Sequence, residues 1–98
     1  MNSKVMVLAR VRAKPGQETK VKEECLALVG PSRAEKGCIN YDLYRAIDDP
    51  TLFIFYENWE SREDIERHLE MPYCSAFDEQ VEGRLAEPEE IMLCEMVN

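Results

Sequence analysis

The sequence predicts an α+β fold in which helices cover one face of a four-stranded antiparallel sheet. Apolar residues alternate with period two in four separate segments, as they do in half-buried strands. They recur with helical spacing in two further stretches, and the two kinds follow the order β-α-β-β-α-β. That order is the ferredoxin-like split βαβ arrangement. The length of 98 residues, 45% of them hydrophobic, suits a single domain over residues 1–98.

The first strand and the first helix are expected within residues 4–37. Residues 4–13 alternate between apolar and mixed faces, and Pro15 with the glycine after it breaks this pattern. From Gln17 apolar side chains recur at i, i+4, i+7 and i+8, which indicates an amphipathic helix. Pro31 should interrupt this helix and loosen its last turns, because proline lacks the amide hydrogen that a helix needs. Gly37 can take the left-handed conformation that ends helices.

Two further strands form a predicted hairpin at the centre of the chain. Residues 38–46 and 52–59 have strand composition, and residues 47–50 between them contain Asp-Asp-Pro, which is typical of turns. So short a connection joins antiparallel neighbours.

The remaining elements are a helical region and a closing strand. Ser61 should begin the helix, with Asp64 three residues on as its capping partner. Pro72 stops or kinks it, and a further helical pattern continues at i+4 spacing as far as Leu85. Residues 91–97 then alternate again as the last strand.

Two of the strands look covered on both sides. Residues 52–59 and 91–97 are apolar at both parities, whereas the outer face of a monomeric sheet is normally polar. Since the helices can cover only one face, we expect a second copy of the chain on the other. The sequence therefore predicts a homodimer.

Charge and composition limit the partners. Lys and Arg number 12 against 20 Asp and Glu, a net charge of −8 that would repel nucleic acid and anionic membranes. No apolar run approaches the roughly 18 residues of a membrane span, and the first four residues lead into a strand without a secretory leader. We expect a cytoplasmic protein that binds neither nucleic acid nor membrane.

The cysteines give no sign of a metal site. They are scattered, with no C-x-x-C pair and no histidine at metal-ligand spacing. Buried, reduced thiols are expected, with a structural zinc or a disulfide framework as the alternatives; no metal is predicted. The four are Cys25, Cys38, Cys74 and Cys94.

Several motifs together resemble a known family. Residues 9–16 (ARVRAKPG), 35–44 (EKGCINYDLY) and 55–61 (FYENWES), followed by His68-Leu69 before Pro72, are similar to the antibiotic biosynthesis monooxygenase domain. The resemblance covers nearly the whole chain in the right order. It implies a dimeric α+β barrel, formed when two ferredoxin-like sheets pack face to face. The family also includes haem-degrading oxygenases and an isomerase, so function must be argued from the site.

His68 is the main catalytic candidate. It is the only histidine, and it lies three residues after Ile65 and one before Leu69, on the border of an apolar helix face. A histidine there can act as acid or base near neutral pH, or be a half-buried side chain bonded to a carboxylate or carbonyl. In several members of the family the corresponding position points into the pocket between helices and sheet.

Tyr73 is the second catalytic candidate. Many members with this histidine carry another just after the proline, where this chain has Tyr73, so a paired-histidine mechanism is not expected. A phenol can donate a hydrogen bond to a quinone or enolate oxygen, although its pKa near 10 makes it a poor base. The alternative is an aromatic at a helix start that packs on Phe77.

Substrate contacts are expected from an aromatic wall and a polar stripe. Trp59 and Phe77 could form the wall on which a flat substrate stacks, although strand aromatics are more often core. Asn40 and Tyr44 share one face of the second strand, as substrate contacts or at a subunit rim. Glu57, in a buried-looking strand, needs a partner such as Arg10 or Arg45. For Glu57 a structural ion pair is favoured over a general base.

No cofactor is expected. The chain has no G-x-G-x-x-G motif for a dinucleotide. Haem-degrading relatives carry Asn, Trp and an iron-binding His at places that fall on Leu8, His68 and about Asp78, and none of these matches. The resemblance thus implies a monooxygenase without haem that oxidises a small aromatic or quinol-like molecule with dioxygen. The alternatives are a non-catalytic small-ligand-binding dimer and an isomerase of a small carbonyl compound.

Overall fold

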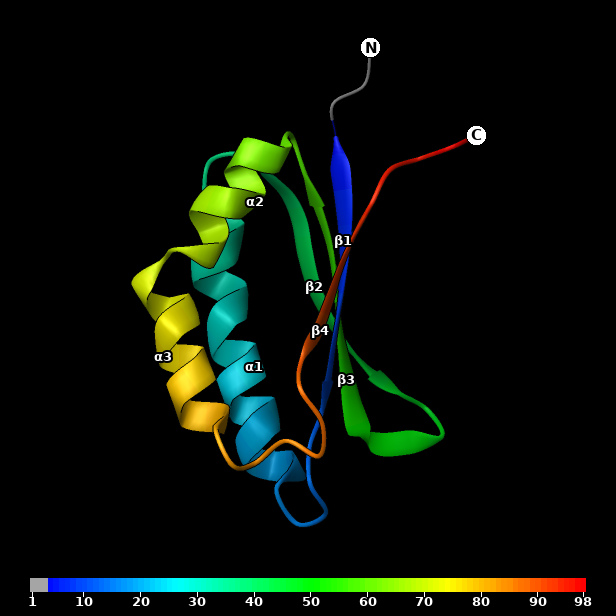
Figure 1. The fold of residues 1–98 in the computed structure, drawn as a ribbon, viewed down its shortest axis with the longest axis vertical. Helices are drawn as coiled ribbons and strands as arrows, with labels where there is room; N and C mark the ends of the chain where they lie inside the picture. Colours follow the sequence, from blue (N-terminus) through cyan, green and yellow to red (C-terminus); the bar gives the residue numbers. More distant parts are fainter. Residues whose placement is uncertain (1–3) are drawn as a thin grey trace.

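The computed structural model describes residues 4–98 and confirms the predicted fold class. Figure 1 shows a sheet with all of the helices on one side of it, in two layers. The expectation that the chain starts without a secretory leader concerns residues 1–3 in part, and these lie outside the described residues. The strands are β1 (Val5–Arg12), β2 (Cys38–Ala46), β3 (Asp49–Trp59) and β4 (Glu90–Cys94), and the helices are α1 (Glu18–Arg33), α2 (Arg62–Leu69) and α3 (Pro72–Val81).

The sheet has the strand order β2-β3-β1-β4, with antiparallel pairing between all neighbours. This is the order of a ferredoxin-like fold, in which the first and third strands lie at the centre. Val7 pairs with Glu57 on β3 and with Leu93 on β4, so these side chains share the face that the helices cover. The core therefore lies between this face and the helices.

Helix α1 continues through Pro31 to Arg33, so the expected interruption was wrong. Pro31 sits in the last turn, where the amide of Ala34 bonds to the carbonyl oxygens of Gly30 and Pro31 at 3.2 Å each. Pro31 lacks the amide hydrogen that would bond to the carbonyl oxygen of Ala27, so the helix loses this one hydrogen bond and still continues for two more residues.

Gly37 ends the turn after α1 as predicted, with φ +90°. A side chain there would also collide with the carboxyl group of Asp64 at the start of α2. The glycine thus lets the entry to β2 pass directly against the first turn of α2. Ser61 caps α2 as expected: its Oγ accepts from the Asp64 amide at 3.2 Å.

Three element boundaries differ from the sequence prediction. β3 begins at Asp49 rather than residue 52, because Ala46 pairs with Asp49 and only residues 47–48 form the turn. Asp49 stabilises this turn by accepting from the amide and hydroxyl of Thr51 and by pairing with Arg12. α3 ends at Val81 before Gly83, whose φ is +78°, and Leu85 instead bridges to Ala13. β4 is shorter than expected and ends at Cys94.

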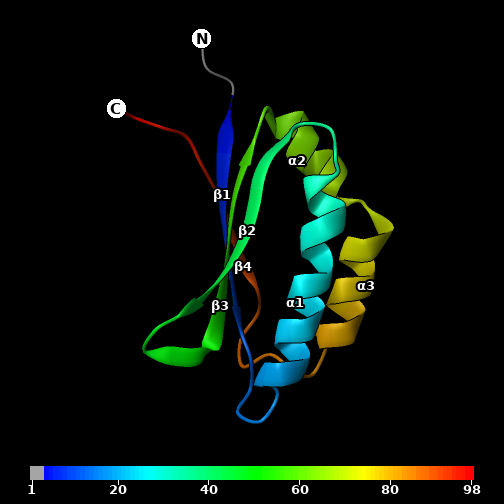
Figure 2. The same ribbon diagram turned by 180° about the vertical axis from the view of Figure 1, so that it is seen from behind.

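The face of the sheet opposite the helices carries exposed apolar side chains. Figure 2 shows this face free of any helix, and Tyr44, Tyr56 and Met92 are 57%, 38% and 47% exposed. These strands are apolar on both faces, as the sequence indicated. The homodimer that would cover them stays a prediction.

Candidate functional site

A small cavity lies between the sheet and helices α2 and α3. Its volume is about 90 Å³. Phe55 and Phe77 contribute to an apolar wall, and Leu69 and Asp78 line it while remaining exposed, so they mark its mouth. The polar side chains of the lining are Tyr41, Glu57, His68, Cys74, Asp78 and Glu89.

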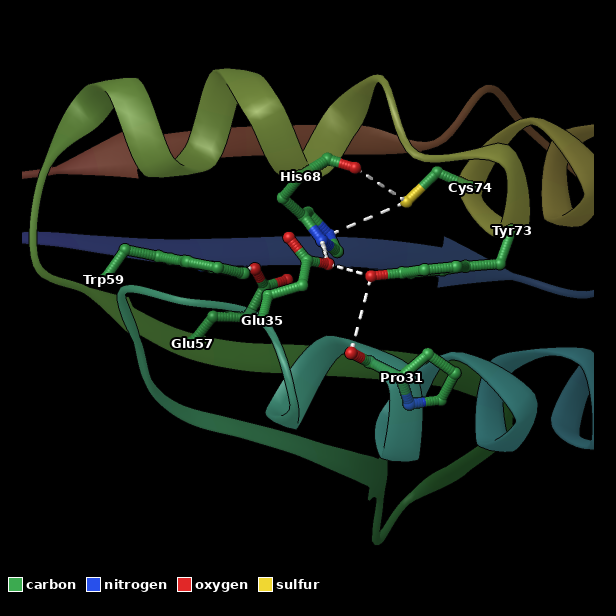
Figure 3. Close-up of polar contacts among 7 residues, drawn as sticks. All are labelled: Pro31, Glu35, Glu57, Trp59, His68, Tyr73 and Cys74. Carbon is green, nitrogen blue, oxygen red and sulfur yellow. Dashed lines mark hydrogen bonds and ion pairs between the residues drawn. The ribbon is translucent and has the colours of Figure 1, made fainter.

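His68 lies in the last turn of α2 and points inward. It is 4% exposed, and its Nδ1 lies 2.6 Å from Oε2 of Glu35 (Figure 3). Because a carboxylate accepts hydrogen bonds, this contact selects the tautomer with hydrogen on Nδ1 and leaves a lone pair on Nε2. The ring packs against Trp59 and Tyr41, with centroid distances of 4.8 and 5.5 Å. The imidazole is therefore held in one orientation.

Glu35 comes from the turn after α1, and sequence reasoning did not single it out. Its carboxylate is almost buried, with 8% of the side chain exposed. Oε2 accepts from the hydroxyl of Tyr73 as well as from His68. The two partners lie more than thirty residues away along the chain, so no local pattern could connect them.

Tyr73 lies at the start of α3 with its hydroxyl aimed at Glu35 rather than at the cavity (Figure 3). The same hydroxyl lies 3.4 Å from the carbonyl oxygen of Pro31. Burial raises the pKa of the phenol above its usual range, and the hydrogen bond and charge of Glu35 act in the same direction. The Tyr73 hydroxyl thus donates its one hydrogen to Glu35. A hydrogen bond from Tyr73 to a substrate stays a prediction.

Cys74 lies against the other edge of the imidazole. Its Sγ is 3.7 Å from His68 Nε2 and donates to the His68 carbonyl oxygen at 3.3 Å. Burial raises the pKa of this thiol to about 12, with a further contribution from the charge of Glu35. The thiol therefore stays protonated at neutral pH. Since Cys74 lines the cavity and Glu35 does not, the Nε2 edge of His68 is the one nearer the cavity.

Glu57 is bonded to Trp59 rather than to Arg10 or Arg45, so the expected ion pair was wrong. Trp59 Nε1 donates to Glu57 Oε1 at 2.9 Å, and Arg10 lies instead 3.7 Å from Glu90. Residues i and i+2 of a strand share a face, and this spacing was the available signal. Burial raises the pKa of the Glu57 carboxyl to about 7, although the bond from Trp59 acts in the opposite direction.

The predicted substrate contacts divide between the two faces of the sheet. Phe77 lines the cavity. Trp59 is fully buried behind His68 and Glu57. Asn40 and Tyr44 lie on the opposite face, where Asn40 bonds to Asp42 and Asn58. The structure thus brings His68 and Phe77 together, while Asn40 and Tyr44 remain apart from the cavity.

Within residues 4–98 there is no group of three or more His, Cys, Asp or Glu side chains suited to hold a metal ion. All four cysteines are free thiols in this part of the chain. None of the described helices is long and apolar enough to cross a membrane.

The chain resembles a known protein family along most of its length. The family model described as "Antibiotic biosynthesis monooxygenase" matches residues 4–80. The chain is 34% identical over 93 residues to "Uncharacterized protein sll1783" of Synechocystis sp., covering 91% of this chain but only 60% of that relative. It is 30% identical over 91 residues to "Probable quinol monooxygenase YgiN" of Escherichia coli, covering 83% and 88% of the two chains.

Solved structures show the same fold over the full length. The chain superposes on Rv0793 from Mycobacterium tuberculosis with a TM-score of 0.91 and 28% identity, covering 98% of this chain and 97% of that one. PA3566 from Pseudomonas aeruginosa gives a TM-score of 0.92 and 32% identity, covering 100% and 98%.

Proposed function

The chain belongs to the antibiotic biosynthesis monooxygenase family, and on this basis we propose that it oxidises a small aromatic, quinol-type substrate with dioxygen and without a cofactor. A relative bearing the name "Probable quinol monooxygenase YgiN" supports this substrate class. The observation that carries the proposal is the buried imidazole of His68, whose Nδ1 is held by Glu35 and whose other edge lies beside a cavity with mostly apolar walls.

In this reaction His68 acts as the general base. Nε2 takes a proton from a substrate hydroxyl, and the resulting anion is a strong enough reductant to transfer electrons to dioxygen. One oxygen atom enters the ring and the other leaves as water, so that a quinol and dioxygen give a hydroxylated quinone and water. The substrate supplies all of the electrons, and no external reductant is required.

Glu35 and Tyr73 act as positioning residues. Glu35 keeps hydrogen on Nδ1 and stabilises the imidazolium that forms after proton transfer. Tyr73 holds Glu35 in turn through its hydroxyl. Trp59 packs behind the imidazole and Phe77 lines the cavity, where a dry wall protects reactive intermediates from water.

We place a second subunit on the open face of the sheet. Asn40 and Tyr44 belong to that face, and in the proposed dimer they lie toward the partner rather than toward the cavity beside His68. Sheet-to-sheet packing of this kind would cover the apolar residues that the single chain leaves exposed.

Oxygen uptake with a panel of quinols tests the proposal. Metal-stripped protein should consume oxygen, and His68→Ala should reduce the rate by at least about a hundredfold, the range expected for loss of a general base. Glu66→Gln, on the exposed face of α2, serves as a control and should leave the rate unchanged. No uptake from folded protein, or uptake that persists in His68→Ala, would reject this function. Proton exchange alpha to a carbonyl without uptake would favour an isomerase instead.

A further inference from the structure

Most of the residues that line the cavity are apolar, but the lining also carries several carboxyl groups. Three carboxyl groups reach it from different elements: Glu57 from β3, Asp78 from α3 and Glu89 from the residue before β4. No lysine or arginine is among the lining residues, all of which belong to the described chain. His68 is the one basic side chain there, and Glu35 already occupies its Nδ1.

Glu57 is the carboxyl group best placed to meet a ligand. Only 4% of it is exposed, and Oε1 accepts from Trp59. Oε2 takes part in no hydrogen bond within residues 4–98, and the side chain lines the cavity. Since Oε2 is not among the described atoms that are fully shielded without a partner, it is open to the cavity, and a hydroxyl group entering there can donate to it.

We propose, on the basis of the function proposed above, that this cavity selects an uncharged phenol through a hydrogen bond to Glu57 and rejects aromatic anions. A carboxylate or phosphate on the substrate would face three carboxyl groups with no cation to offset them, and such like-charge contacts are strongly unfavourable. A neutral hydroxyl can instead donate to Glu57.

Burial raises the pKa of both Glu57 and Glu89 to about 7, so the cavity repels anions most strongly above this pH. Glu57 can accept a hydrogen bond from a phenol when it is ionised and donate one to a quinone oxygen when it is protonated. The same carboxyl could therefore bind both the reduced substrate and the oxidised product.

The size of the cavity limits the substrate to about one ring. Its volume of about 90 Å³ is below the roughly 150 Å³ of a cavity that holds a benzene molecule. A single ring would thus fill it and extend into the mouth near Leu69 and Asp78. A carboxylate on that ring that pointed toward the mouth would lie on the side where Asp78 lines the cavity.

Anaerobic calorimetry with two matched probes tests this inference. Methylhydroquinone and 2,5-dihydroxybenzoate share the quinol ring but carry a methyl group or a carboxylate, and without oxygen neither is turned over. At pH 8 the neutral probe should bind at least about tenfold more tightly, as expected where like charges meet. Glu57→Gln, which keeps an oxygen for Trp59, should narrow this ratio at least threefold, roughly the effect of one charge at a partly hydrated site.

Two further variants keep the test decisive. Asp78→Asn, at the exposed mouth, should also narrow the ratio, and it replaces Glu57→Gln if that variant does not fold. Glu23→Gln, on the exposed face of α1, makes the same change in net charge far from the cavity and should leave the ratio unchanged. Equal affinity for the two probes, tighter binding of the carboxylate, or no binding of either would overturn the inference.

This binding test is separate from the test of turnover. Discrimination between the probes without oxygen uptake in air would support the selective cavity and reject the proposed oxidation. Oxygen uptake without a difference in affinity between the two probes would support the proposed oxidation and reject the selective cavity.

Discussion

At the residue scale, His68 owes its orientation to side chains from distant parts of the chain. Glu35 bonds to Nδ1 from the turn after α1, Trp59 packs on the ring from the end of β3, and Cys74 lies beside Nε2 at the start of α3. The sequence indicated that His68 borders an apolar face, and its burial agrees. Its link to Glu35 could not be predicted, because it depends on how the α1–β2 turn meets α2.

Glu35→Gln should allow His68 to populate both of its neutral tautomers. A glutamine can donate to Nδ1 as well as accept from it, so the form with hydrogen on Nε2 becomes populated. Because His68 is the only histidine, its ¹⁵N NMR signals identify the tautomer directly. Wild-type protein should show hydrogen on Nδ1, and the variant should show a mixture and about tenfold slower oxygen uptake. Identical ring spectra for the two proteins would contradict the positioning role.

Glu57 should make stability depend on pH. Its folded pKa of about 7 lies above the usual value near 4.3, so the folded state binds more protons between these values. The stabilisation that the folded protein gains from protonated Glu57 is complete below about pH 4 and is lost as the pH rises through about 7. As the pH rises from 5 to 8, the free energy of unfolding of wild-type protein should therefore fall relative to that of Glu57→Gln, by on the order of 2 kcal/mol. Urea unfolding at each pH measures this difference, and parallel curves would contradict the raised pKa.

At the element scale, the junction between α1, β2 and α2 determines the position of the site. The boundaries of β2 and the cap at Ser61 follow from local sequence, as does the glycine at 37. The contact of that glycine with Asp64 is a tertiary feature, and it brings Glu35 within reach of His68. The errors at β3 and α3 concern backbone pairs that the hydrophobic pattern does not mark. Ala46 and Asp49 pair across their turn, and Leu85 bridges to Ala13, although neither partner is marked by periodicity.

A pair of glycine variants isolates this junction. Gly16 and Gly37 both have φ near +90°, but only Gly37 has a neighbour where its Cβ would lie. Gly16→Ala should destabilise the protein by about 1–2 kcal/mol, through the left-handed backbone alone. Gly37→Ala should cost at least about 1 kcal/mol more, since Asp64 must move, and should also slow oxygen uptake. Equal unfolding free energies for the two variants would show that the contact with Asp64 has no influence.

At the scale of the whole molecule, the open face of the sheet is the feature that a single chain leaves unexplained. The sequence indicated strands that are apolar on both sides, and the structure places Tyr44, Tyr56 and Met92 together on the uncovered face. What covers them depends on a surface match between two molecules, which periodicity along one chain does not encode.

A charge placed on that face should prevent dimer formation. Tyr56→Lys would bury a cation at a sheet-to-sheet interface without a designed partner. Leu26→Lys, on the exposed side of α1 at 51% exposure, adds the same charge to the opposite layer and serves as the control. Sedimentation should show a dimer for wild type and Leu26→Lys and a monomer for Tyr56→Lys. A monomeric wild type would refute the proposed assembly.

The incorporation of labelled oxygen tests the central claim most directly. A quinol that the wild-type protein turns over would be reacted under ¹⁸O₂ in ordinary water, and the product would be analysed by mass spectrometry before exchange with solvent. Cofactor-free monooxygenation predicts one ¹⁸O atom in the quinone, the other in water, and loss of labelled product with His68→Ala. An unlabelled quinone, or labelling that does not depend on His68, would contradict it.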